Sequence, residues 1–596
     1  MKAFSLFTLV GIAAVALPSP AQIAVSLTSS STTAAVGIPV TWSPQIDTSA
    51  LSADADTGPF LYRYRIRRVG QDFHMLRDFG PKTDLTWAAS EHEGTYEIEL
   101  TVRDSSTGAS VSRKSLFQVT PVATGTPVLT STSNPLVFLY SAPPCAPGSR
   151  MRVQFQDPSG YNQTTPYKSC AAGLSMNFYL AGMQADTAYQ VHHTVDTGSA
   201  FLDGPTLTAV TGDLPYQFAP YTLLQAKTAS ANSGVLLQST ISEPAIATDL
   251  NGNVVWFYAG STTPLTLTRP ESGGRFLAIH EEAGSDPSHQ TLQEFDLAGN
   301  TIIETNAARI NEQLAAMNVR QITAFHHEAT RLADGTILAL GATEQILTDV
   351  QGRGPQDVLG DMILVLDQNM QVVWTWDAFD YLDTSRPATL YETCHPSVNG
   401  CPPFYLAPQA NDWLHGNALQ LTPDGNILYS IRHQDWLVKI DYENGAGSGN
   451  IIWRLGKDGD FTYDSRDPYP WFSHQHDANF EFINPAMLAV FDDGNLRQAT
   501  NPLAHSRGQV IKLDEQNRIA TLAVNADLGA YSFALGSAHR LPSGNYHFEV
   551  GWVIDPISGA VTSQAVEVDP FGNMVYDIQA ATPEYRSFRM TNLYIP

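Results

Sequence analysis

The stretch ATDLNGNVVWFY at residues 247–258 predicts a tight β-hairpin: an apolar strand ends at Asp249, an Asn/Gly turn follows, and a second apolar strand begins. The same pattern recurs in EFDLAGNTIIE (294–304), VLDQNMQVVWTW (365–376), KIDYENGAGSGNIIWRLG (439–456), KLDEQNRIATLA (512–523) and EVDPFGNMVYDI (567–578). Successive copies lie about 50–75 residues apart, whereas a four-stranded propeller blade needs about 40–45. The repeat therefore predicts blades that carry inserted loops.

A second hairpin signal alternates with the first. A small polar or Pro/Gly turn leads into an apolar strand in LADGTILAL (332–340), LTPDGNILYS (421–430), NPAMLAVF (484–491) and LPSGNYHFEV (541–550). Two hairpins per repeat make a four-stranded blade, and a closed ring of blades leaves few exposed edges. We expect an all-β protein with a six-bladed β-propeller over residues 216–596, in which a strand near 587–594 completes the first blade. The alternative is an ordinary run of hairpins in sandwiches.

The chain before the repeats has short strands of another kind. Tyr62, Tyr64 and Ile66 alternate with arginines, and a period of two marks strands with one buried face. We expect two small sandwiches before the propeller, an immunoglobulin-like one over 22–122 and a fibronectin-like one over 123–215. The Ser/Thr/Ala-rich residues 22–35 are expected to form a loose leader.

Residues 1–21 have the features of a signal peptide: Lys2, an uncharged apolar run, and small residues before a cleavage site near Ala21. No other stretch reaches about 18 apolar residues, so we expect no stable membrane insertion. The mature protein is then periplasmic or secreted. In such an oxidising compartment two disulfides can form, and the pairs Cys145–Cys170 and Cys394–Cys401 each stay within one element.

The formal net charge of −26 bears on the class of partner. A nucleic-acid-binding protein normally carries a basic patch, and because the sequence has no Lys/Arg cluster, we expect no nucleic-acid partner. A strongly acidic protein repels anions, so an anionic substrate needs a local group of neutral or cationic donors. The simpler interpretation is that the charge serves solubility alone.

Polar residues gather just before the second hairpin signal, where a blade's innermost strand is expected. The segments are FHHEATRL (325–332), WLHGNALQL (413–421), SHQHDANFEF (473–482) and LGSAHRL (535–541). Aligning their alanines at 329, 418, 478 and 538 gives equivalent positions to His326, His327, His415, Asn417, Gln475 and His476. These side chains are expected to converge on the axis, although any one histidine taken alone is more often an ordinary polar residue.

Such a cluster has a definite chemistry. A neutral imidazole is a nucleophile, a base and a hydrogen-bond donor near pH 7. With Arg432 of LYSIRHQDW as a fixed cation, histidines can hold a tetrahedral oxyanion and stabilise the charge that develops during group transfer. A metal site is the rival interpretation. His326 and His327 are adjacent and point to opposite faces of a strand, but histidines from different blades could share an ion.

The motifs HHE, HGN followed by SIR, WRLG and QHD together resemble those of the bacterial arylsulfate sulfotransferases, over residues 220–596. The resemblance implies that His476 is the nucleophile and becomes sulfated. It implies that His415, Asn417 and Arg432 bind the sulfuryl oxygens and assist proton transfer. A histidine of HHE completes the site; His327 is favoured and His326 remains open. Leu455 and Gly456 of WRLG are structural.

The resemblance further implies ping-pong transfer from an aryl sulfate to a phenol, with no cofactor and no metal. Two other functions are carried as alternatives: a non-catalytic propeller that binds a partner, and a metal- or quinone-dependent propeller oxidoreductase. The sequence contains no C-x-P-x-R motif of the formylglycine sulfatases. The two N-terminal sandwiches can serve homodimer formation, surface attachment or glycan contact, and the sequence does not separate these roles.

Overall fold

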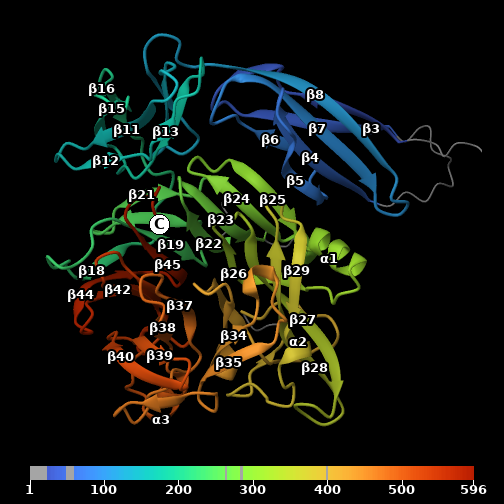
Figure 1. Ribbon diagram of the computed structural model, residues 1–596, viewed down its shortest axis with the longest axis vertical. Helices are drawn as coiled ribbons and strands as arrows, with labels where there is room; N and C mark the ends of the chain where they lie inside the picture. The colour runs from blue at the N-terminus through green and yellow to red at the C-terminus, as the bar shows by residue number, and fades with distance from the viewer. Residues whose placement is uncertain (1–22, 48–58, 262–264, 282–285, 397–399) are drawn as a thin grey trace, which may run out of the picture.

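The structure, a computed structural model, describes residues 23–47, 59–261, 265–281, 286–396 and 400–596. The predicted signal peptide lies outside the described residues. The fold is all-β (Figure 1), and its described α-helices are short: α1 (Ala307–Ala316), α2 (Ala378–Tyr381) and α3 (Asn495–Thr500). Among the described helices, none is both long and apolar enough to cross a bilayer.

The N-terminal part has two groups of sheets. In the first, β1 (Ala24–Ser29), β3 (Val40–Asp47) and β6 (Leu85–Trp87) face β2 (Thr33–Ala35), β8 (Ser110–Thr120), β7 (Gly94–Asp104), β4 (Phe60–Arg68) and β5 (His74–Gly80). Trp42, which is completely buried, lies in the core between them. The expected loose leader at 22–35 was wrong: β1 pairs with β3 and β2 with β8, since alternating residues such as Val25 reach the core.

The second group comprises β9 (Val128–Ser131), β10 (Phe138–Ala142) and β14 (Met176–Leu180), with a sheet of β11 (Arg150–Gln156), β12 (Asn162–Thr164), β13 (Lys168–Ser169), β15 (Ala188–Asp196), β16 (Phe201–Asp203) and β17 (Leu207–Val210). The disulfide Cys145–Cys170 lies in this part, and Cys394–Cys401 lies in the long insertion before His415. Both predicted pairings are confirmed.

Six antiparallel units of four strands make up most of the rest of the described chain. They are β45 (Glu584–Met590) with β19 (Val235–Thr240), β20 (Ile246–Asp249) and β21 (Val254–Phe257); β22 (Leu265–Glu271), β23 (Arg275–His280), β24 (Thr291–Asp296) and β25 (Thr301–Asn306); β26 (Ala324–Arg331), β27 (Ile337–Thr348), β28 (Pro355–Leu366) and β29 (Val372–Asp377); β32 (Gly416–Leu421), β33 (Ile427–Ile431), β34 (Trp436–Ile440) and β35 (Ile451–Gly456); β37 (His476–Phe480), β38 (Met487–Asp492), β39 (Arg507–Asp514) and β40 (Ile519–Asp527); and β41 (Gly536–Arg540), β42 (Tyr546–Ile554), β43 (Val561–Val568) and β44 (Met574–Ala580). Each predicted Asp-turn hairpin joins the last two strands of a unit. Further strands pair with these units or with one another at their edges: β18 (Tyr221–Gln225), β30 (Thr393–Cys394), β31 (Ala410–Asp412) and β36 (Thr462–Asp464).

The first strands of these units contact one another in the order β45, β22, β26, β32, β37, β41 and again β45. The chain end supplies β45, which pairs with β19, as expected for the strand that completes the first unit. This strand lies at 584–590 rather than 587–594. Residues 591–595 turn back instead, with the Thr591 N–H donating to the Ile595 carbonyl, and the ring of Tyr594 enters a buried cluster.

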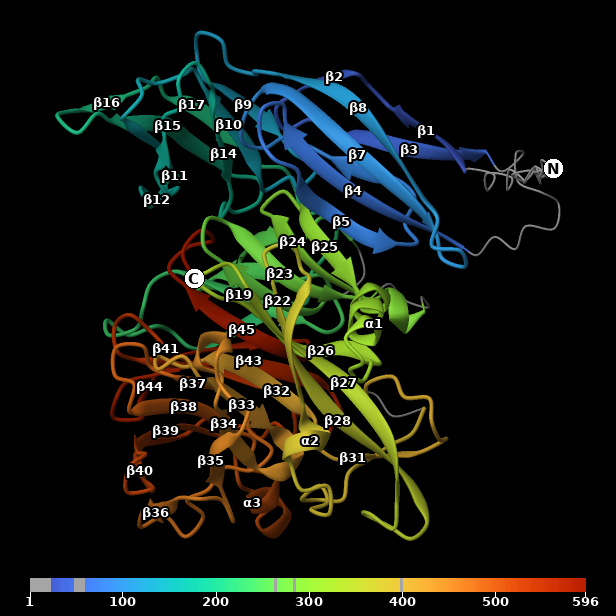
Figure 2. The ribbon, with the colours of Figure 1, turned by 45° about the vertical axis from the view of Figure 1, so that its right-hand side comes forward.

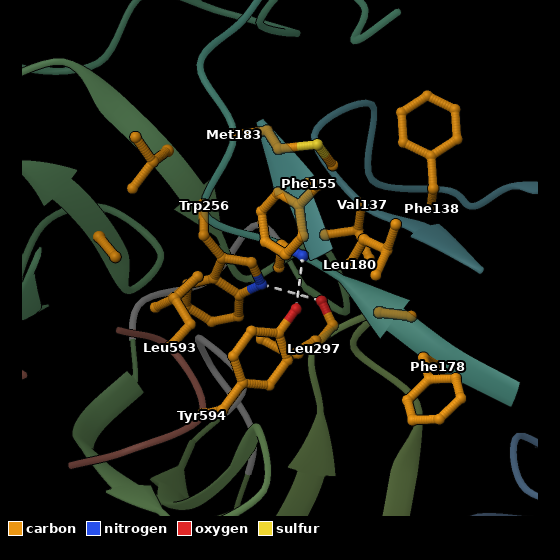
Figure 3. Close-up of a cluster of buried hydrophobic side chains, with 14 of the residues drawn as sticks. Val137, Phe138, Phe155, Phe178, Leu180, Met183, Trp256, Leu297, Leu593 and Tyr594 are labelled. Carbon is orange, nitrogen blue, oxygen red and sulfur yellow. Dashed lines mark hydrogen bonds between the residues drawn. The ribbon is translucent and has the colours of Figure 1, made fainter. Parts of the chain in front are cut away.

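The N-terminal groups pack firmly against the repeat units, above them in Figure 2. Strand β5 joins β25 in parallel, and the buried Asp78 pairs with Arg309 at 3.0 Å. Between the second group of sheets and the repeat units, apolar side chains from both parts form one cluster around Trp256 (Figure 3). The Trp256 indole donates to the Leu297 carbonyl at 2.8 Å. Burial of aromatic side chains dominates such contacts, so the parts form one body.

Candidate active site

Irregular backbone positions the histidines that the sequence singles out. β-Bulges interrupt the pairing of β26 with β27, β32 with β33 and β37 with β38. Beside them, His327, His415 and Asp477 have φ angles of 59°, 52° and 49°, in the left-handed region that residues other than glycine seldom adopt. A bulge bends its strand and re-aims a side chain, and strained backbone of this kind is concentrated at functional sites.

Four imidazole rings lie in a row. The ring centres of His327 and His415 are 4.6 Å apart, those of His415 and His433 are 4.7 Å apart, and those of His433 and His474 are 5.7 Å apart. The residues come from β26, from the segments before β32 and β37, and from the 3-10 turn Arg432–Gln434. The fold thus brings together His327 and His415, as the alignment of the repeats predicts, and adds His433 and His474, which the alignment did not include.

His326 lies behind this row. Its Nδ1 is 2.8 Å from Nδ1 of His327, and its Nε2 is 3.0 Å from Oδ1 of the buried Asp361. The other oxygen of Asp361 accepts from the Tyr429 hydroxyl and from the Gly416 N–H. Of the two histidines in HHE, His327 therefore contacts the cluster, and His326 links it to a buried carboxylate.

His476 is buried at the start of β37. Its Nδ1 is 2.8 Å from Oδ2 of Asp493, and the Leu535 N–H is 3.3 Å from its Nε2. A ring that donates from Nδ1 to a carboxylate carries its lone pair on Nε2. Burial, together with the positive charge of Arg432, holds the pKa of His476 well below its ordinary value of 6.5. The ring is therefore neutral near pH 7, and its Nε2 lone pair, which accepts a long hydrogen bond from the Leu535 N–H, can act as a nucleophile once that bond is released.

Arg432 is the fixed cation of this region. It is 8% exposed, its Nη2 donates to the Phe533 carbonyl at 2.9 Å, and its Nη1 contacts Nε2 of His433. After burial and the neighbouring imidazoles, its charge also lowers the pKa of His327. Arg432 reaches Phe533, two residues before the Leu535 that contacts His476. Its other contact, His433, lies beside His415, so the predicted cation and imidazoles share one region. Such a set can bind a tetrahedral oxyanion.

Asn417 and Gln475 connect neighbouring strands. The Asn417 amide donates to the Gln475 carbonyl at 2.7 Å, while its Oδ1 is buried without a partner among the described residues. The Gln475 amide donates to Ser430 Oγ and to the carbonyls of Ile431 and Trp436. Asn417 thus fixes β32 against β37, and Gln475 serves packing rather than the cluster.

Three groups of described side chains have the spacing of metal ligands, with ligand atoms within 4.8 Å of one another. One, of Cys394, Cys401 and Asp412, has its sulfur atoms in a disulfide. The others are Asp412, His415 and His433, and Glu392, His433 and His474; both contain His433, whose Nε2 contacts the Arg432 guanidinium. A guanidinium repels a metal cation at this distance, so the arrangement favours an anion over a metal.

Comparison with known proteins identifies the family. The model of the arylsulfotransferase (ASST) family matches residues 206–588. The chain belongs to this family. No curated protein matches the sequence. Similar solved structures include chicken CNTN1 domains FN1–FN3 (8% identity, 33% of this chain and 67% of that chain, TM-score 0.13) and a two-domain fibronectin type III segment of chicken tenascin (12% identity, 33% and 99%, TM-score 0.13).

In this ASST-family chain, residues next to the histidines form a buried ionic group that no sequence pattern predicted. Arg586 of β45 is completely buried; its Nη1 is 2.8 Å from Glu328 and 3.5 Å from Asp477, and its Nη2 donates to the Asn417 carbonyl at 2.8 Å. Glu328 and Asp477 directly follow the histidines of HHE and QHD, which was the available signal. Nothing in the sequence pointed to Arg586, because the last strand of the ASST domain brings it there.

The insertion before His415 also reaches the ASST site, which the sequence analysis did not expect. Glu392, two residues before the disulfide-bonded Cys394, contacts Nε2 of His474. Nδ1 of His474 is 3.0 Å from Asp435, and, against the effect of burial, these two carboxylates raise the pKa of His474. The insertion therefore forms one wall of the site, and its Glu392 places a negative charge beside His474.

Proposed function

We propose that this protein transfers a sulfuryl group from an aryl sulfate to a phenol by a ping-pong mechanism in which His476 is sulfated. Membership of the ASST family supports the class of reaction. In this proposal the six units are the blades of a propeller over 216–596, preceded by sandwich domains at 22–122 and 123–215. The cyclic order of first-strand contacts supports that architecture.

The observation that carries the proposal is the pairing of His476 with Asp493. The carboxylate at 2.8 Å keeps the proton on Nδ1 and leaves the lone pair on Nε2. Burial raises the pKa of Asp493, and the positive charge of Arg432 works against that rise; the proposed mechanism requires the ionised carboxylate. As Nε2 bonds to sulfur the ring gains positive charge, and Asp493 offsets this charge.

In the first half-reaction, Nε2 of His476 forms a bond to sulfur and the bond between sulfur and the phenolic oxygen breaks. The oxygen keeps that electron pair and takes a proton from His415. Nδ1 of His415 lies 2.7 Å from Oδ2 of Asp412, and a carboxylate in this position stabilises the imidazolium form. Arg432 binds the sulfuryl oxygens, and His327 completes the site beside His415, with the two ring centres 4.6 Å apart.

In the second half-reaction an acceptor phenol takes the place of the released phenol. His415 removes its proton, the phenolate oxygen bonds to sulfur, and the sulfur–nitrogen bond breaks with its electron pair returning to Nε2 of His476. The sulfate group is transferred without net oxidation or reduction, so the chemistry calls for no cofactor.

Mass spectrometry after brief exposure to 4-nitrophenyl sulfate without acceptor tests the proposal. We expect one added sulfuryl group on the peptide that contains His476 and none in the His476→Asn variant. His505→Asn is a matched control, because His505 forms a similar pair with Asp527 at 2.8 Å on the surface. Absence of the label, its presence on another peptide, or release of nitrophenol that an added phenol does not accelerate would overturn the proposal.

We also propose export to the periplasm or the exterior, since two disulfides form and persist in oxidising compartments. A homodimer is one role that the N-terminal sandwiches can serve. Sedimentation of the purified chain at two concentrations distinguishes a dimer from a monomer.

A further inference from the structure

A second cleft, of 660 Å³, lies where three parts of the fold meet. Its walls come from the first sandwich around β6 and β7, from the segment around β13 and β14, and from the turns of the β22–β25 unit. In Figure 2 these parts adjoin where the first sandwich sits above β24 and β25. The cleft shares no lining residue with the histidine cluster. Its volume is in the range of small-molecule sites, which often occur between domains.

The cleft is preformed. The Tyr594 hydroxyl, which Figure 3 shows among the side chains of the buried cluster, accepts from the Ala181 N–H at 3.0 Å and donates to the Tyr179 carbonyl at 2.9 Å. The Asn300 amide donates to the Tyr179 hydroxyl at 3.1 Å. These bonds fix the chain end, the second sandwich and the β24–β25 turn to one another, so a ligand would meet walls that are already ordered.

An unpaired cation faces this cleft. Arg68, at the end of β4, makes no side-chain hydrogen bond or ion pair with any residue that the structure describes. A Cβ atom added at Gly94, whose φ is +139°, would lie 2.7 Å from Nε of Arg68, so the glycine leaves the space that the guanidinium occupies. The carboxylates nearby are engaged: Glu91 pairs with Lys168 at 2.9 Å, and Asp296 accepts from Asn300. An uncompensated guanidinium favours an anion, here against a net charge of −26.

Two further groups in the cleft select for a ring. The half-buried Trp87 lies against Tyr96, with ring centres 5.3 Å apart. An aromatic wall of this kind accepts a flat ring face.

We propose that this cleft binds a small ring-bearing oxyanion, with Arg68 pairing its sulfate or carboxylate and Trp87 lying along its ring. Two sources share this chemistry: an aryl sulfate and an acidic pyranose. The site is separate from sulfuryl transfer, so the proposal stands or falls independently of the proposed function.

Calorimetry on the full chain tests it in the His476→Asn background, which removes turnover. The probes are phenyl sulfate and methyl glucuronide, with phenol and methyl glucoside as their uncharged counterparts. Arg68→Gln removes the cation. Arg67→Gln is the matched control, because Arg67 is the neighbouring residue of β4, pairs with Glu97 and does not line the cleft. Arg68→Lys keeps the charge but loses the planar fork, and thermal melts establish that each variant is folded.

We expect one anion to bind at a site that Arg68→Gln weakens at least tenfold and Arg67→Gln leaves unchanged. Arg68→Lys should give an intermediate affinity, and the uncharged counterparts should not bind there. Loss of the phenyl sulfate site assigns an aryl sulfate, and loss of the glucuronide site assigns an acidic pyranose. Equal affinity of Arg68→Gln and Arg67→Gln for both anions would overturn the proposal, as would equal binding of the charged and uncharged probes.

Discussion

The pairing of His476 with Asp493 makes the sharpest prediction, through the substitution Asp493→Asn. The side chains are both buried and lie 2.8 Å apart. Loss of a charge-assisted hydrogen bond costs about 1.5–3 kcal/mol. The new amide can in addition donate to Nδ1, which moves the ring proton to Nε2 and blocks the lone pair that attacks sulfur. We expect a total of about 3–5 kcal/mol, or a 10²–10⁴-fold fall in the rate of the first half-reaction.

The assay is single-turnover release of 4-nitrophenol from 4-nitrophenyl sulfate, with melting temperature measured alongside. Asp527→Asn is the matched control, since Asp527 pairs with His505 over the same 2.8 Å but is exposed. That variant should keep the wild-type rate. If Asp493→Asn is folded and reacts within threefold of the wild type, Asp493 does not set the tautomer of His476, and the mechanism proposed for the nucleophile is wrong.

Three more outcomes are expected. Because the pKa of His476 is held well below 6.5, the nucleophile stays unprotonated in mild acid, and the acidic limb of the pH profile for the first half-reaction should lie below pH 6.5; a limb above that value would contradict the assignment. Arg432→Lys keeps the charge but loses the guanidinium fork that reaches the Phe533 carbonyl, and we expect kcat/KM for the donor to fall about 10–100-fold, with wild-type kcat/KM as the contrary result. Burial raises the pKa of Glu584 from 4.5 to about 8. The folded state therefore keeps a proton that the unfolded chain loses, and the free energy of unfolding should decline as pH rises over this interval. Urea unfolding at pH 5 and pH 8 should show a smaller decline for Glu584→Gln than for the wild type, and an equal decline would exclude this carboxyl as the cause.

Local chemistry explains what the sequence could predict. The turn at Asp249 and its five copies depend only on neighbouring residues, because the aspartate accepts from the backbone of its own turn, as in the Asn251 N–H bond to Asp249. Alignment of the repeats then placed His327, His415 and His476 at successive first strands; the structure has His327 and His476 on β26 and β37 and His415 directly before β32. The cyclic register of a repeat protein converts sequence spacing into spatial proximity, so this part of the site was accessible without a structure.

Other parts depend on contacts that no local pattern records. Asp493 follows β38, and it meets His476 only because β37 and β38 pair in one particular register. The choice between His326 and His327 was decided by a bulge, since a single extra residue reverses which side chain faces the cluster. Glu392 arrives on an inserted segment, whose course follows from the Cys394–Cys401 loop and its packing against β28 rather than from the repeat.

Strand β45, the last of the chain, pairs with β19, which is synthesised some 350 residues earlier, and this has a consequence for folding during synthesis. Until β45 has left the ribosome, β19 presents a bare edge, and the carboxylates of Glu328 and Asp477 lack the guanidinium of Arg586. A chain that stops before residue 584 would thus lack Arg586, which pairs with the carboxylates next to the site histidines, and the strand that pairs with β19. Premature termination or clipping of the tail should yield inert, protease-sensitive material instead of a weakened enzyme.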